Sequence, residues 1–332
     1  PTLVQLQSDI TSPFPPLDLM VHIGEISAAS FNDTIPAKEV WRVSEDGELR
    51  DPFKKLTTVF QMSEEMFFLH YGKDGCNRHV LIDECRELFG EIYEQIPELP
   101  FCNIWTAMQL SSRLPKGALF HMGVSNTRRC WNMFQLPESV ESACNVGCCG
   151  IDGCVSTLVG ASLVNPDRLC YVVVGDLTFF YDLNSLGNHH IGTNLRVMLV
   201  NNGRGTEFRL GIHHCNVFGD DADKYMAAAG HFGNKSPLLV KHYAEDLGFH
   251  YLSATTKEEF MTALSNFTNP QLSDHSMILE VFTDSKDESE ALYLMSHIQS
   301  DAKGMVRSKL KDAVRNVAGE KGINAIKKIL KK

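Results

Sequence analysis

The sequence has no long apolar run and no excess of positive charge, and each absence argues against a class of protein. No apolar segment approaches the ~18 residues that a membrane-spanning helix requires, and the first residues do not resemble a signal peptide. The 332 residues carry a formal net charge of -10, which argues against general affinity for nucleic acid. We therefore expect a protein whose partners are neither nucleic acid nor membrane.

Regularly paired cysteines are also missing, although the chain contains ten cysteines. Their spacing lacks the CxxC pairs of zinc and iron–sulfur sites and offers no disulfide framework, so we expect a reducing, cytoplasmic location. The densest group is Cys144, Cys148, Cys149 and Cys154. Small buried side chains that line a pocket are the favoured interpretation of this group, and metal ligation is the alternative.

Internal repeats and low-complexity tracts are absent as well. With 43% hydrophobic and 22% charged residues the composition is that of an ordinary globular protein, and the length predicts about two domains. A proline-bounded linker at Pro97–Pro100 separates a first domain, 1–98, from a second domain, 99–300. Residues 301–332 have the pattern of a basic, amphipathic helical extension, for which a membrane-surface or partner-binding role is the minority interpretation.

Hydrophobic periodicity and turn residues predict the main elements of both domains. In the first domain we expect strands at Leu17–Ile23 and Glu39–Val43, a strand-like Thr57–Met62 and a helix at Leu81–Ile96. In the second we expect helices at Asn103–Arg113, from about Cys154, at Leu238–Leu247 and at Lys257–Asn266, and strands at Ala118–Met122, Phe249–Ser253 and Met277–Phe282. The segment Gly123–Arg129 is expected to be a loop.

Two apolar runs in the second domain end in polar residues. Leu169–Val174 stops at a Gly-Asp pair and Leu195–Val200 stops at an Asn-Asn pair, and both runs are typical of buried parallel strands. Asp182–His190 has the composition of the helix that a parallel crossover requires. Ligands in such sheets bind at the carboxyl ends of the strands, so these two ends are expected to face one site.

The polar residues at these ends suit Mg²⁺ and a diphosphate. Mg²⁺ takes six oxygen ligands, of which Asp176 and Asn202 could supply two by side chain and Arg204 one by its main-chain carbonyl. A Gly-Asp pair alone is more often a strand-to-helix turn in which Asp caps the helix. The pairing with a second strand end favours the metal site.

The same residues carry a family resemblance. Gly175-Asp176-Leu177, followed by 23 residues and Asn201-Asn202, resembles the signature of thiamine diphosphate (ThDP) enzymes. Within them, GDLTFFYDLNSL and NVGCCGIDGCVSTLVG are most similar to the GDLSxxxDLNxL and NRGASGIDGxxST motifs of the 2-succinyl-5-enolpyruvyl-6-hydroxy-3-cyclohexene-1-carboxylate synthases. The similarity runs from about Leu17 to about Leu292, the later part of the family's usual chain.

The resemblance implies a fold and a domain order. It implies an α/β ThDP-binding fold, a mostly parallel sheet with helices on both faces, preceded by part of a smaller α/β central domain similar to transhydrogenase domain III. Family members begin with a pyrimidine-binding domain, so this sequence is expected to open inside the central domain. It also implies that ThDP and Mg²⁺ are the cofactors.

Individual residues match positions that contact cofactor and substrate in the family. Ser125 and Arg129 match the serine and arginine of a GNSxxxR loop, although adjacent arginines alone are more often solvated surface. Ile151 matches the bulky residue that holds the cofactor bent. The expected cofactor contacts are Ser125, Gly150, Ile151, Gly175, Asp176, Leu177, Thr178, Asn202 and Phe208, the metal ligands Asp176, Asn202 and Arg204, and the substrate contacts Arg129 and Glu207.

Three departures from the family concern the substrate. Val146 replaces a family arginine, and Ser30-Phe31 stands where a Lys-Arg pair is expected. Each lost charge-assisted contact is worth about 1.5 to 3 kcal/mol, which predicts that the cofactor is kept and that the substrate differs from isochorismate. Glu207 also places an anion where the family has an apolar residue beside the thiazolium.

No catalytic residue can be assigned, because the activating glutamate of the family lies in the pyrimidine-binding domain. We therefore expect this chain alone to be inactive and to work with that domain of the complete protein or of another subunit, in a homodimer or homotetramer. The leading hypothesis is a 2-oxo acid decarboxylation with carboligation. The alternatives are a simple 2-oxo acid decarboxylase with the pyrimidine domain on another chain, and a non-catalytic ThDP-binding or assembly module.

Overall fold

The computed structural model describes residues 2–7, 17–24, 37–72, 80–147, 150–210, 213, 215, 217–219, 221 and 236–299. The chain divides into two compact units, one reaching from Leu3 to Ile96 and one beginning at Pro97. This division lies two residues before the boundary expected between 98 and 99. The assignment of the units to a central and a diphosphate-binding domain stays a prediction. The predicted extension 301–332 and the Ser30-Phe31 position lie outside the described residues.

The first unit contains a three-stranded parallel sheet in the order β1-β2-β3. Phe60 of β3 packs against Phe67 of α2, with ring centroids 5.0 Å apart, so the helix covers the sheet through aromatic contacts. The two predicted strands and the predicted helix of this unit are confirmed. The bounds are β1 Leu17–Ile23, β2 Ala37–Ser44, β3 Leu56–Gln61, α2 Glu64–Tyr71 and α3 Val80–Glu94, and a short α1 spans Thr2–Gln5.

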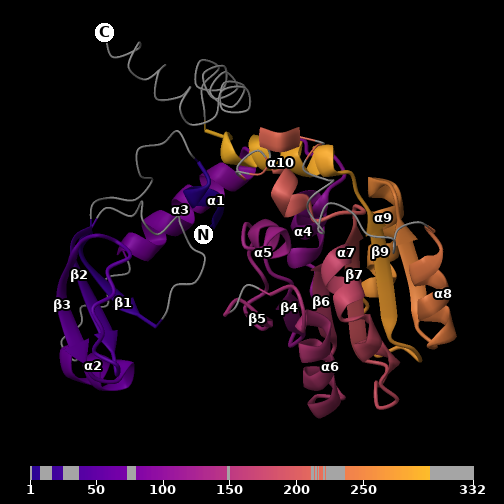
Figure 1. The fold of residues 1–332 in the computed structure, drawn as a ribbon, viewed down its shortest axis with the longest axis horizontal. Coiled ribbons are helices and arrows are strands. Elements are labelled where there is room, and N and C mark those ends of the chain that lie inside the picture. The colour runs from indigo at the N-terminus through magenta and orange to yellow at the C-terminus, as the bar shows by residue number, and fades with distance from the viewer. Residues whose placement is uncertain are drawn as a thin grey trace, which may run out of the picture. The chain divides into compact units, whose positions relative to one another are not determined.

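The second unit is built on a six-stranded sheet in the order β5-β4-β6-β7-β9-β8 (Figure 1). Every strand pairing in it is parallel, which confirms the predicted α/β class. All seven residues of β7 are buried, as expected of a strand covered on both faces. The bounds are β4 Leu119–Met122, β5 Glu141–Cys144, β6 Cys170–Gly175, β7 Leu195–Asn201, β8 His250–Ala254 and β9 Met277–Phe282.

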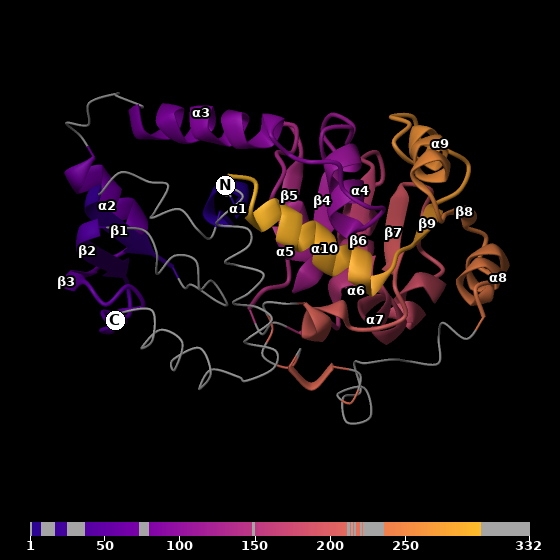
Figure 2. The ribbon, with the colours of Figure 1, turned by 90° about the horizontal axis from the view of Figure 1, so that it is seen from above.

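Helices cover both faces of this sheet. Alternate residues of β6 point to opposite sides, since Val172 joins a core with Leu158 of α6 while the Tyr171 hydroxyl donates to the Phe267 carbonyl of α9 at 3.0 Å. Figure 2 shows α8 and α9 beside β8 at one end of the row of strands. The bounds are α4 Asn103–Ser111, α5 Asn126–Trp131, α6 Cys154–Val164, α7 Asp176–Tyr181, α8 Leu239–Asp246, α9 Lys257–Phe267 and α10 Ser285–Ser296.

The crossover between β6 and β7 differs from the prediction. A helix was expected at Asp182–His190, but α7 begins at Asp176 and a 3₁₀ turn follows at Leu183–Gly187. The Asp176 carboxylate accepts a hydrogen bond from the Leu177 amide at 2.9 Å, which supports a helix start directly after the strand. The Gly-Asp pair is therefore both the polar end of β6 and the start of α7.

Two further elements were not predicted correctly. The expected loop Gly123–Arg129 becomes helical at Asn126, where α5 begins. The strand β5 was missed because its residues are mostly exposed and form no apolar run. In the described part of the chain, no helix combines the length and the hydropathy that crossing a bilayer demands.

Candidate functional site

The carboxyl ends of β4, β6 and β7 bring predicted site residues to one edge of the sheet. Met122 pairs with Val173 and Gly175 pairs with Val200. Asp176 and Asn202 directly follow β6 and β7, and Ser125 comes three residues after β4. Because the carboxyl ends of parallel strands meet at the same edge of a sheet, all three residues lie at this edge.

Asp176 and the turn after β7 have the donor chemistry predicted for a metal. Asp176 is 2% exposed, and a carboxylate so buried requires compensating partners. The Asn202 Oδ1 accepts a hydrogen bond from the Arg204 amide at 3.3 Å, and Gly203 adopts a φ of 76°, which favours glycine. The turn thereby fixes the main chain that carries the Arg204 carbonyl.

A buried glutamate in β9, which sequence reasoning missed, supports this turn. Glu280 is 1% exposed and accepts hydrogen bonds from Asn201 Nδ2 and from the Tyr251 hydroxyl, both at 2.7 Å. Asn201 Oδ1 in turn accepts from the Gly203 amide at 3.2 Å. Burial raises the pKa of Glu280, the two donors oppose that shift, and the nearby Asp176 carboxylate adds to it. The sequence did contain one signal for Glu280, because it is the single acid within the otherwise apolar run MILEVF.

A second buried acid lies at the start of α10. Glu288 is 1% exposed, and its Oε1 accepts from the Asn103 amide at 3.0 Å and from the Thr283 hydroxyl at 2.9 Å. Burial raises its pKa to about 7. This side chain therefore joins the first turn of α4 to the end of β9.

The glycine-rich loop after β5 is tied to α6 by side chains. Asn145 Nδ2 donates to the Gly153 carbonyl at 3.3 Å and to the Thr157 hydroxyl at 3.1 Å. Gly153 is the N-cap with a φ of 78°. A Cβ at Gly150 would lie 2.5 Å from an Asp152 carboxylate oxygen, so a larger residue there would require the Asp152 side chain to turn away. Ile151 is half-buried beside it.

The first turn of α6 is capped by an acidic side chain from the segment after α7. The carboxylate of Asp182 accepts from the Ser156 amide at 2.6 Å, so one of the unpaired amides of the first turn already has an anionic partner. Asp182 is the second acid of the GDLTFFYDLNSL motif. Its contact with α6 was not foreseen, because the two residues lie 26 positions apart.

Ser125 has a strained backbone. Its φ of 60° and ψ of -124° place a non-glycine residue in a region that costs about 1 to 3 kcal/mol. Such strain concentrates at functional sites, and among the described residues only Lys54 shares a positive φ without being glycine. The strained residue is the one that matches the family serine.

Arg129 and Glu207, both expected to contact substrate, contact each other. Arg129 Nη1 and Nη2 lie 2.7 Å from Glu207 Oε2 and Oε1, and both side chains are 23% exposed. Burial lowers the pKa of Arg129, but the hydrogen bonds and charge of Glu207 outweigh it and raise that pKa overall. The pair joins α5 to the 3₁₀ turn Thr206–Arg209.

The residues around Glu207 complete this loop. The Thr206 hydroxyl is buried and has no hydrogen-bond partner in the described structure. Phe208 contacts His213 edge-on, with ring centroids 5.0 Å apart. Among the described residues, the Thr206 hydroxyl is thus a buried polar atom without a partner.

The cysteines give no support to a cysteine-ligated metal site. Burial raises the pKa of Cys154 to about 11, so its thiol is inert, and Cys148 and Cys149 lie outside the described residues. Throughout the described ranges, no cluster of three or more His, Cys, Asp or Glu side chains could hold a metal ion. The predicted Mg²⁺ site is of another kind, with one carboxylate, one amide and one main-chain carbonyl.

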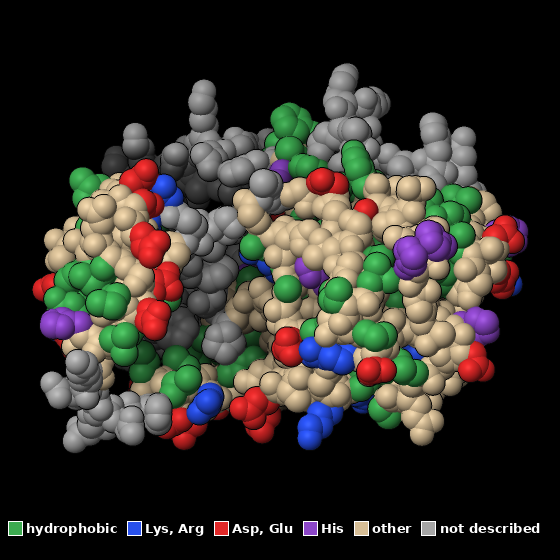
Figure 3. Space-filling model, turned by 90° about the horizontal axis from the view of Figure 1, so that it is seen from below, with side chains coloured by type: hydrophobic (Ala, Val, Ile, Leu, Met, Phe, Trp, Pro, Cys, Tyr) green, Lys and Arg blue, Asp and Glu red, His purple; other side chains and the backbone are tan. Residues whose placement is uncertain are grey.

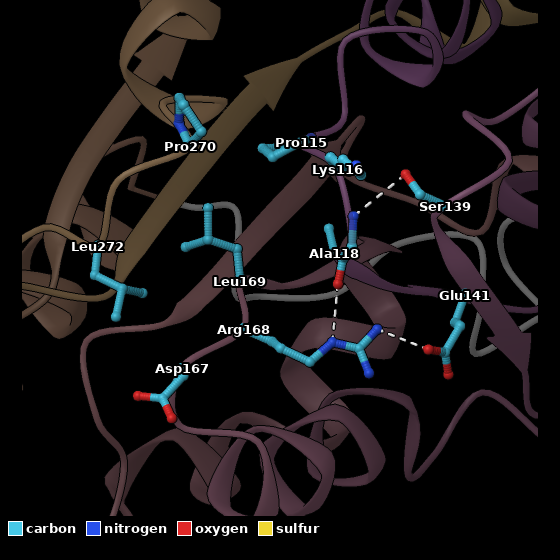
Figure 4. A pocket seen from close by; sticks show the side chains of 11 residues that line it. Pro115, Lys116, Ala118, Ser139, Glu141, Asp167, Arg168, Leu169, Pro270 and Leu272 are labelled. Atoms are coloured by element: carbon cyan, nitrogen blue, oxygen red, sulfur yellow. Dashed lines mark hydrogen bonds and ion pairs between the residues drawn. The ribbon is translucent and has the colours of Figure 1, made fainter.

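Two cavities of the described structure lie elsewhere. One of about 440 Å³ sits at the amino ends of β4 and β6 (Figure 4), and another of about 320 Å³ is lined by 186–189, 191–193, 247–249 and 274–276. In the first, Arg168 donates to the Gly117 carbonyl at 2.8 Å and to Glu141 at 2.9 Å, so this guanidinium is paired within the cavity lining. Neither cavity includes a predicted site residue.

Surface charge on the second unit is mixed on the face that Figure 3 shows. The described Lys, Arg, Asp and Glu side chains there are scattered and do not gather into one basic patch.

Sequence comparison identifies relatives, although no family model matches the chain. A 2-succinyl-5-enolpyruvyl-6-hydroxy-3-cyclohexene-1-carboxylate synthase of Bacteroides fragilis is 33% identical over 263 residues, covering 77% of this chain and 45% of that protein. Synthases of the same name from Phocaeicola vulgatus and Bacteroides thetaiotaomicron are each 32% identical, over 265 and 259 residues, and cover 77% of this chain and 44% of their own length. The chain thus spans less than half the length of the curated relatives it matches.

The resemblance inferred from the two motifs is confirmed: this chain is a homologue of part of the 2-succinyl-5-enolpyruvyl-6-hydroxy-3-cyclohexene-1-carboxylate synthases.

Proposed function

We propose that this chain is the diphosphate- and Mg²⁺-binding portion of a ThDP-dependent synthase that decarboxylates a 2-oxo acid and joins the remaining carbon fragment to an acceptor. The observation that carries the proposal is the convergence of Asp176 and the Asn202–Arg204 turn at neighbouring strand ends. Homology to the synthases supports the same conclusion.

The residues present fit these groups. A buried carboxylate, a side-chain amide and a main-chain carbonyl are the hard oxygen ligands that Mg²⁺ takes. A Cβ at Gly175 would meet no protein atom within 4 Å, which leaves room for a phosphate beside the first turn of α7. The unpartnered hydroxyl of Thr206 adds a polar atom next to the turn.

Each residue then has a role in binding or orientation. Bound ThDP supplies the electron sink for decarboxylation, and the protein supplies metal ligands, orientation and protection from water. Asp176 and Asn202 bind Mg²⁺ by side chain and Arg204 by its carbonyl. The diphosphate is expected to contact Ser125, Gly150, Gly175, Leu177 and Thr178, and the cofactor rings to contact Ile151 and Phe208.

The complete active site requires a partner. The activating glutamate is proposed to come from a pyrimidine-binding domain, either of the complete protein or of another subunit, in a cytoplasmic homodimer or homotetramer. The substrate is a 2-oxo acid, and the acceptor is proposed to differ from isochorismate because Val146 replaces a cationic contact. The chain by itself is therefore expected to bind cofactor without turning over substrate.

A simple 2-oxo acid decarboxylase is the second candidate. It is favoured by the Arg129–Glu207 pair, which neutralises a residue otherwise expected to hold an acceptor carboxylate. Product analysis of the complete protein separates the two, since an aldehyde alone indicates decarboxylation and a longer carbon skeleton indicates carboligation.

Calorimetric titration of this chain with ThDP, with and without Mg²⁺, tests the proposal. We expect saturable binding that requires Mg²⁺ and that is lost in Asp176→Ala, because the metal then loses its only side-chain anion in the proposed ligand set. Asp167→Ala, an exposed aspartate at the amino ends of the strands, is the matched control. Unchanged affinity in Asp176→Ala would overturn the site assignment.

A further inference from the structure

The pairing of Arg129 with Glu207 bears on which substrate the proposed site accepts. Resting on the proposed function, we infer that Glu207 is a built-in carboxylate ligand of Arg129 that excludes substrate carboxylates from this guanidinium. The site then selects a substrate that presents an uncharged group at this position. The class of substrate excluded is the 2-oxo dicarboxylic acids and other polyanionic acids that need Arg129 as their anchor.

The contact has the geometry of a carboxylate fully bound by arginine. Two nitrogens meet two oxygens at 2.7 Å each, which is the bidentate fork that arginine forms with carboxylates. To bind Arg129, a substrate carboxylate would have to displace the Glu207 carboxylate, which is part of the same protein chain. Displacement leaves the Glu207 carboxylate at only 23% exposure without its cation, which opposes the exchange.

Both partners are held by ordered structure. Arg129 lies on α5, whose next two residues, Cys130 and Trp131, are 1% exposed, and Trp131 donates to Asn103 at 3.2 Å. Glu207 lies two residues after Gly205, on the turn that follows the proposed metal loop. The ion pair is therefore preorganised and connects the loops that follow β4 and β7.

The position of the pair marks it as part of the site. Its arginine is four residues after the strained Ser125, and its glutamate directly follows the buried Thr206 hydroxyl. The other described ion pairs at comparable distance, such as Arg168–Glu141 with its glutamate 72% exposed, lie away from these strand ends. The Arg129–Glu207 pair thus joins two elements that the proposed cofactor site already uses.

Titration with 2-oxoglutarate tests the inference directly. We expect the wild-type chain to bind 2-oxoglutarate only weakly, and Glu207→Gln to bind it about tenfold or more tightly than wild type, because the guanidinium is released. Adding Arg129→Gln to Glu207→Gln should remove that gain. Glu141→Gln, which frees Arg168 instead, is the matched control and should bind no better than wild type.

A purely structural role predicts a different outcome. If the pair only joins two loops, Glu207→Gln lowers the melting temperature and gains no affinity for 2-oxoglutarate, and that result overturns the inference. Glu207→Leu, which restores the apolar character expected in the family, serves if the glutamine variant does not fold.

Titrating the same proteins with ThDP and Mg²⁺ keeps the two proposals apart. Cofactor binding without any gain of 2-oxoglutarate affinity in the Glu207 variants rejects the inference alone. Absence of ThDP binding in all proteins rejects the proposed function, while the 2-oxoglutarate titration still reports on Arg129.

Discussion

The amino and carboxyl edges of the six-stranded sheet differ in how their polar groups are arranged. At the amino edge lie cavities of about 440 and 320 Å³, and in the first of them Arg168 pairs with Glu141. At the carboxyl edge buried acids, a strained serine and a glycine turn with φ of 76° hold polar atoms in fixed positions. In this protein, therefore, polar groups held in fixed positions identify the candidate site better than cavity volume does.

The largest expected effect comes from removing the acid that supports the turn after β7. Glu280→Ala leaves Asn201 and Tyr251 without their acceptor in a buried setting, and we expect a loss of about 4 kcal/mol in the free energy of unfolding. Urea denaturation measures it. At the other edge, Glu141→Ala removes an exposed partner and should cost less than about 1 kcal/mol. Equal losses would contradict the contrast between the edges.

The next effect is a pH dependence that a buried acid at the carboxyl edge should cause. The folded-state pKa of Glu288 is raised from 4.5 to about 7, so the folded protein binds this proton more tightly than the unfolded chain. The contribution of this proton to the free energy of unfolding is fully present below pH 4.5. It is lost as pH rises towards about 7, by up to about 3 kcal/mol. Glu288→Gln should therefore gain stability relative to wild type between pH 4.5 and 7. Urea unfolding at both pH values checks this, and a constant difference would refute it.

A smaller effect is expected where Asp182 caps α6. Asp182→Ala removes the acceptor of the Ser156 amide and should cost about 1 kcal/mol, whereas Asp182→Asn should retain most of the stability. Thermal unfolding of both variants measures the effect. If alanine and asparagine behave alike, the cap contributes nothing.

The smallest expected effect is a gain in the free energy of unfolding. Ser125→Gly allows a φ of 60° without strain and should stabilise the fold by about 0.5 to 1 kcal/mol, measured by urea denaturation. The same change should weaken ThDP binding, because the matched serine hydroxyl is lost. Stabilisation with unchanged affinity would mean that the strain serves no binding role.

Sequence patterns predicted the framework of this molecule better than its contacts. The strands ending at Gly175 and Asn201 were predictable because continuous apolar runs must be buried on both faces. The start of α7 at Asp176 was not, since it depends on a side chain that bonds to the next amide. The exposed strand β5 carried no periodic signal.

The candidate site shows the same limit. Asp176 and Asn202 follow from strand ends and a motif, but the support of Asn201 by Glu280 spans 79 residues of sequence and the Arg129–Glu207 pair spans 78. The family resemblance, not charge, indicated that Arg129 and Glu207 were substrate contacts. Only the tertiary structure reveals that the two charges meet.

The contact between Asp182 and Ser156 has a mechanical consequence. The helix α7 holds Asp176 at its first residue, and Asp182 follows its last residue directly, about 9 Å further along the axis. The helix α7 therefore carries the proposed metal ligand at its first residue, and the residue after its other end contacts the first turn of α6. A displacement of Asp176 along the axis of α7 would therefore also displace the carboxylate that caps α6, so the spacing of the two acids within one motif couples the proposed metal ligand to α6.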